Sequence, residues 1–131
     1  MSNAAEKTEY KPLPEGDYVM QLESFEIKPT KKGDAKMVAA RFQVSKGDDK
    51  GAKVFENFLI EHSNPKVVEI ANDRLDKFLK GVGCAEGLEG IGHDYTLLGE
   101  YESENFIAAL KIKEGTNGYS DQNRIAAFKK R

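Results

Sequence analysis

Cationic side chains gather in two stretches that lie far apart along this chain. Residues 28–53 contain 8 Lys and Arg against 3 Asp and Glu, and residues 105–131 contain 6 against 2. The other stretches are acidic, with 2 against 6 over residues 1–27 and 4 against 11 over residues 54–104. The formal net charge of -2 hides this segregation. If the fold brings the two cationic stretches together, they form a local site for a polyanion.

A single-stranded nucleic acid needs cations for its phosphates and flat rings on which its bases stack. Phe55 lies in the opposite phase to the apolar residues of its predicted strand, so we expect it to face outward beside Arg41 on the neighbouring strand. The alternative for Phe55 is that a loop or the N-terminal arm buries it. The alternative for any single lysine is an ordinary solvated position on the surface. The candidate nucleic-acid-binding residues are Lys28, Lys31, Lys32, Lys36, Arg41, Lys53, Phe55, Lys111, Lys113, Tyr119, Arg124 and Lys130.

The residues most often used in catalysis or metal binding do not form a recognisable group. His62 and His93 are far apart and have no Cys or His neighbour at metal-ligand spacing. Cys84 has no activating motif, so we expect a small buried residue, and a single cysteine cannot form an internal disulfide. We therefore expect no catalytic residue, no metal and no cofactor; a small nuclease is kept as an alternative class.

Five strands and one helix are expected to position these side chains. In the first strand, Tyr18, Met20 and Leu22 alternate until the pattern slips by one at Ser24, which predicts a β-bulge. Glu56 is an exception, because it falls in the apolar phase of the third strand. The later strands are predicted at residues 36–45, 53–61, about 105–113 and about 123–130, with a hairpin turn at residues 115–118.

The helix lies between the third and fourth strands. Asn64 is the expected cap, Pro65 occupies the first helical position, and the helix ends at Gly81. Its apolar face is predicted from residues recurring at spacings of three and four: Val67, Ile70, Ala71, Leu75, Phe78, Leu79 and Val82.

Three strands, a helix and two strands follow the element order of the OB-fold, a five-stranded Greek-key barrel. We therefore predict a mainly β, OB-fold-like domain over residues 14–131, preceded by a flexible N-terminal arm over residues 1–13. A small α+β sheet with a helix on one face would have the same order and is the alternative. In an OB-fold, the two cationic stretches would flank the ligand groove.

Several short motifs, taken in order, resemble a known family. They are Pro14-Glu15-Gly16-Asp17-Tyr18, Phe55-Glu56-Asn57-Phe58, Asn64-Pro65-Lys66, Leu97-Leu98-Gly99 and Asn123-Arg124-Ile125. The resemblance, over about residues 12–131, is to a phage and prophage domain-of-unknown-function family whose members are described as candidate single-stranded-DNA-binding proteins. It implies a setting in phage replication or recombination but supplies no binding residues. One departure is the basic end Phe128-Lys129-Lys130-Arg131, where many single-stranded-DNA-binding proteins have an acidic tail.

The predicted function is therefore non-catalytic, sequence-tolerant binding of single-stranded DNA in phage replication or recombination, in the cytoplasm of a bacterial host. The alternative is a protein-binding adapter that docks replication or recombination proteins of the phage or host. No membrane partner is expected, because no apolar run approaches the roughly 20 residues of a spanning helix. The oligomeric state is open, with a homodimer as one option.

Overall fold

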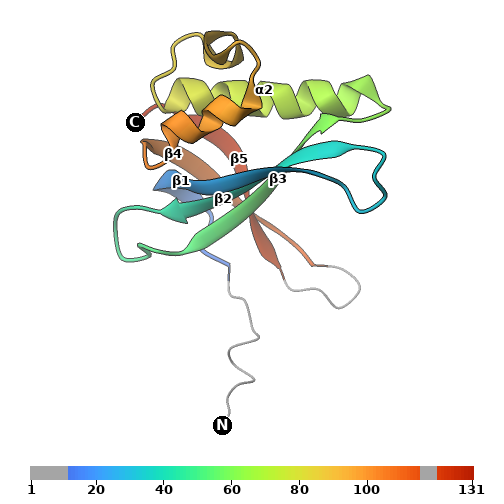
Figure 1. Cartoon of the computed structure of the whole chain (residues 1–131). Coiled ribbons are helices and arrows are strands. Elements are labelled where there is room, and N and C mark those ends of the chain that lie inside the picture. Colours follow the sequence, from blue (N-terminus) through green and yellow to red (C-terminus); the bar gives the residue numbers. More distant parts are fainter. Residues whose placement is uncertain (1–11, 116–120) are drawn as a thin grey trace.

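In the computed structural model, residues 12–115 and 121–131 are described, and they form a mainly β fold (Figure 1). The strands are β1 (Gly16–Pro29), β2 (Lys36–Val44), β3 (Lys53–Glu61), β4 (Asn105–Lys113) and β5 (Gln122–Lys129). Helix α2 (Pro65–Gly81) follows β3, and two 3-10 helices, η1 (Gly87–Ile91) and η2 (Tyr95–Tyr101), lead into β4. The prediction of a mainly β fold with its helix between the third and fourth strands is confirmed.

All five strands form one antiparallel sheet in the order β3-β2-β1-β4-β5. The first three strands are consecutive neighbours and β4 returns to lie beside β1, which is the Greek-key arrangement. Strands β3 and β5 are consequently the two edges. Figure 1 shows the sheet curling, so that β4 and β5 pass behind β1, β2 and β3 while α2 lies across it.

Strand β1 changes its pairing along its length. Its register against β2 shifts between Leu22 and Ser24, which confirms the bulge predicted from the slipped alternation. Residues 16–21 pair with β4, and β1 pairs with β2 from Met20 to Pro29, so the two pairings overlap only just before the shift. The bulge therefore marks the bend at which one long strand passes from one half of the sheet to the other.

Phenylalanine rings from four strands and the helix meet in the core. They are Phe42, Phe58, Phe78, Phe106 and Phe128, all buried. The ring of Phe78 packs edge-to-face on three of them, with centroids 5.7 Å from Phe42, 5.3 Å from Phe106 and 6.0 Å from Phe128. A sixth ring, Phe25, packs against the core, but Phe55 is 61% exposed. Phe55 is thus the one phenylalanine that folding leaves largely in water.

Helix α2 begins as predicted. The Asn64 side chain accepts a hydrogen bond from the Lys66 N–H at 3.0 Å, and Pro65 is the first helical residue. Ala71, Leu75, Phe78 and Leu79 are buried. The prediction that Ile70 belongs to the buried face is wrong, because it is 57% exposed. Its side chain lies where α2 faces the gap between β3 and β5, so no strand covers it.

The described chain begins beside β5. The Leu13 N–H donates to Asn123 Oδ1 at 2.8 Å, and Asn123 Nδ2 donates to the Leu13 carbonyl at 3.0 Å. Residues 1–11 of the predicted arm, Tyr119 and most of the predicted 115–118 turn lie outside the described residues. Within the described part of the chain, no helix is long and apolar enough to cross a membrane.

Candidate nucleic-acid interface

A buried carboxylate bridges the two sheet edges. The Glu56 side chain on β3 has no exposed surface, yet it accepts hydrogen bonds from two elements on the other side of the gap. From β5, Arg124 Nε donates to Glu56 Oε2 at 3.1 Å and the Ile125 N–H donates to the same oxygen at 2.7 Å. From α2, Arg74 NH2 lies 3.1 Å from Glu56 Oε1. These contacts explain why a charged residue occupies the apolar phase of β3.

Arg74 completes this group, which we call the Glu56 cluster (Glu56, Arg74, Arg124 and the Ile125 backbone). Its NH2 also donates to the Ile125 carbonyl at 2.8 Å. Its guanidinium lies 5.0 Å from the ring centroid of Phe58 and 5.5 Å from that of Phe128. Hydrogen bonds and rings therefore hold Arg74 in one orientation.

Phe55 and Arg41 form an exposed pair on the outer face of the sheet. They are directly opposite each other in the β2–β3 register, and the Arg41 guanidinium lies 5.5 Å from the Phe55 ring centroid. The prediction that Phe55 faces outward beside Arg41 is confirmed. Arg41 has no acidic partner among residues 12–115 and 121–131. A flat ring and an unpaired cation are thus presented together to solvent.

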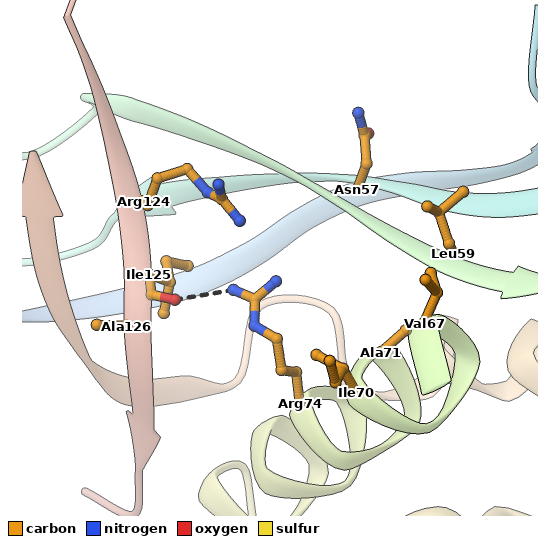
Figure 2. A pocket seen from close by; sticks show the side chains of 9 residues that line it. All are labelled: Asn57, Leu59, Val67, Ile70, Ala71, Arg74, Arg124, Ile125 and Ala126. Atoms are coloured by element: carbon orange, nitrogen blue, oxygen red, sulfur yellow. Dashed lines mark hydrogen bonds between the residues drawn. The ribbon is translucent and has the colours of Figure 1, made fainter. Parts of the chain in front are cut away.

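Three hollows meet along the outward-facing residues of β3. The platform hollow, 330 Å³, contains Arg41, Phe55 and Asn57. The seam hollow, 430 Å³, lies between β3, α2 and β5 and contains Asn57, Leu59, Arg74 and Arg124 (Figure 2). The loop hollow, 330 Å³, lies beside the β1–β2 connection and contains Leu59, Lys31, Lys32 and His62. Because the platform and seam hollows share Asn57 and the seam and loop hollows share Leu59, the three hollows adjoin one another along β3.

The lysines of the first cationic stretch divide into paired and unpaired groups. Lys53 lies 2.7 Å from Glu23 and 3.1 Å from Gln43, so its charge is neutralised across the sheet. Lys36 lies 3.5 Å from Glu61, and Lys28 lies 4.0 Å from Glu26. Lys31 and Lys32, beside the loop hollow, have no ion pair within the described residues.

Cations of the two stretches come together beside Asn57. Arg124 of the second stretch and Arg41 of the first lie in adjoining hollows that share Asn57. Lys111 is opposite Arg124 on the neighbouring strand, and Lys113 is two pairs further toward the end of β4. Lys130 is remote from this place: the backbone of its neighbour Lys129 lies beside Gly81, at the C-terminal end of α2. The middle of β5, at Arg124, therefore lies near the first cationic stretch, whereas Lys130, just past the end of β5, does not.

No group of three His, Cys, Asp or Glu side chains suited to a metal occurs in the part of the chain that is described. Cys84 is buried as predicted. A hydrogen bond with the Cys84 thiol, together with burial, raises the pKa of the Tyr101 hydroxyl. His62 Nδ1 accepts the Asn64 N–H at 3.0 Å.

Two residues of this surface, Arg74 and Asn57, were not among the candidates. The sequence does contain a signal for Arg74. It is three positions from Ala71 and four from both Ile70 and Phe78, so it is a cation on the apolar face of the helix. A carboxylate in the apolar phase of β3 and a cation on the apolar face of α2 each require a buried partner. Nothing about Asn57 in the sequence marks it as the meeting point of two hollows.

Fold and site together define a small, curled β domain with a concave surface of cations and one exposed aromatic ring. The profile of the family described as "Protein of unknown function (DUF669)" matches residues 1–96, and the chain belongs to that family. The match spans β1 to β3 and α2 and ends before β4 and β5. No curated protein matches the chain.

Proposed function

We propose that this protein binds single-stranded DNA, without catalysis and with little sequence preference, along the outer face of β3. The observation that carries the proposal is the exposed Phe55 ring, which lies in a hollow beside Arg41, a cation without an acidic partner among the described residues. Exposing a phenylalanine to this extent sacrifices hydrophobic stabilisation, whereas stacking of one base on it contributes about 1–3 kcal/mol to binding.

The strand order supports an OB-fold-like reading. A Greek key with β1 at its centre and β3 and β5 at its edges is consistent with a five-stranded barrel that is open between those edges. OB-folds bind oligonucleotides on the second and third strands and in the adjoining loops. Here those strands carry Arg41 and Phe55, and the loop between β1 and β2 carries the unpaired Lys31 and Lys32. The resemblance to phage proteins supports a role in phage replication or recombination.

The test is a titration of fluorescent oligo-dT by anisotropy at low and moderate salt. Wild-type affinity should fall as salt rises, because phosphate contacts release counterions. Phe55→Ala should weaken binding by about 5- to 150-fold, which corresponds to the loss of one stacked base. Phe55→Trp is the matched control and should bind at least as tightly as wild type. Absence of binding by the wild type at low salt, or equal affinity of Phe55→Ala, would refute the proposal.

A further inference from the structure

The seam hollow has a charge that distinguishes it from its two neighbours. Arg74 and Arg124 both contribute to its surface, and no Asp or Glu side chain does. Glu26 accompanies the cations of the platform hollow, and Asp34 accompanies those of the loop hollow. The carboxylate that both arginines contact, Glu56, is completely buried. The seam hollow is therefore cationic and carries no competing anion of its own.

The orientation of Arg124 leaves donors available. Only its Nε donates to Glu56, and its two terminal nitrogens have no hydrogen-bond partner within residues 12–115 and 121–131. Figure 2 shows Arg124 reaching from β5 and Arg74 from α2 into the gap beside β3. The guanidinium of Arg124 is thus fixed on one side by a buried carboxylate and presents its other nitrogens to the hollow. A preoriented guanidinium is well suited to the paired oxygens of a phosphate.

Apart from Asn57, the rest of the hollow is apolar. Val67 and Ile70 on α2 and Leu59 on β3 form its walls, and Ile70 is exposed there for 57% of its surface. An anionic group flanked by a flat or apolar one matches this combination of donors and walls. The hollow adjoins the Phe55 platform through Asn57, so a strand that stacks on Phe55 can continue into it without leaving the concave surface.

We propose that the seam hollow is a second nucleotide subsite, in which Arg124 holds a backbone phosphate and the α2 wall packs against the adjoining sugar or base. This inference rests on the proposed function. It adds a path: the DNA crosses β3 at Asn57 and passes between the two sheet edges and α2. An acidic peptide with an apolar side chain has related chemistry, but continuity with the exposed ring favours nucleic acid.

Ala126 allows a test that leaves the Glu56 cluster intact. It lies on the surface of the seam hollow, is exposed, and faces the same side of β5 as Arg124. Ala126→Glu should weaken oligo-dT binding by roughly tenfold and lower the salt slope by about 0.7, the value for one phosphate contact on a single strand. Ala126→Lys should strengthen binding. The matched control is Ala85→Glu, which makes the same charge change at an exposed position after α2.

Oligonucleotide length separates the two subsites. The penalty of Phe55→Ala should be present with the shortest oligo-dT that binds, whereas that of Ala126→Glu should appear only with longer ones that reach the seam. If Phe55→Ala weakens binding but Ala126→Glu behaves like Ala85→Glu at every length, the second subsite is refuted while the proposed function stands. If the wild type does not bind oligo-dT at low salt, both are refuted.

Discussion

Replacing Glu56 with alanine should strongly destabilise the fold, although the change lies on an edge strand. The carboxylate is fully buried and is the shared acceptor for two guanidiniums and the Ile125 N–H. Once it is removed, these donors lose their partner at the same time. Nothing else in the described residues is placed to accept the Ile125 N–H.

The magnitude depends on which donors water can reach afterwards. Arg124 has a side chain that is 43% exposed, so it can rehydrate at little cost. The Arg74 side chain is only 21% exposed and stays among phenylalanine rings. The buried Ile125 N–H costs about 1–3 kcal/mol when left unsatisfied. Breaking a buried ion pair on one side typically costs about 3–5 kcal/mol, and we expect Glu56→Ala to lose that much.

Urea unfolding followed by circular dichroism measures this loss, since the chain has no tryptophan for fluorescence. Glu61→Ala is the matched control on the same strand: its carboxylate lies 3.5 Å from Lys36 but is exposed, so we expect a change below about 0.5 kcal/mol. Glu56→Gln should fall between the two, because its amide oxygen still accepts the Ile125 N–H. If Glu56→Ala is within about 1 kcal/mol of Glu61→Ala, the cluster does not stabilise the fold as argued.

Three further predictions concern the α2 region. Desolvation acts to raise the pKa of Asp76, but the hydrogen bond from the Leu88 N–H and the nearby lysines outweigh it, so the net pKa is lowered. Asp76→Asn should therefore lower the free energy of unfolding in urea by about 1 kcal/mol at pH 7. The difference from wild type should vanish as the pH falls through the folded-state pKa of Asp76. Gly87→Ala should lower the melting temperature well below that of Gly33→Ala: both glycines have positive φ, but only at Gly87 would a Cβ lie 1.8 Å from Asp76 Oδ1. Asn64→Ala should cost about 1 kcal/mol by removing the helix cap, and an unchanged urea midpoint would contradict this.

Local patterns in the sequence predicted the elements well because each pattern reflects a local constraint. The slip at Ser24 could be read directly, since a bulge reverses the side-chain alternation of a strand wherever it occurs. The Asn64 cap was equally readable, because the cap bonds to a residue two positions away. The outward position of Phe55 followed from strand periodicity alone.

The site depended on contacts that no local pattern contains. Glu56 was recognisable as a charged residue in the apolar phase of its strand, but its partners Arg74 and Arg124 lie 18 and 68 positions further along the chain. The exposure of Ile70 was missed because its periodicity is that of a buried residue, and only the gap between the sheet edges leaves it uncovered. Lys53 was counted as a free cation, although a bulge in β1 brings Glu23 within 2.7 Å of it.

The capped backbone at Ile125 also bears on how copies of this protein avoid one another. Free N–H and C=O groups along an edge strand can recruit a strand from another molecule and start aggregation. On β5, Glu56 accepts the N–H of Ile125 and Arg74 donates to its carbonyl, so both backbone groups of this residue already have a side-chain partner. Side chains from β3 and α2 therefore oppose the addition of a further strand at this point of the sheet edge.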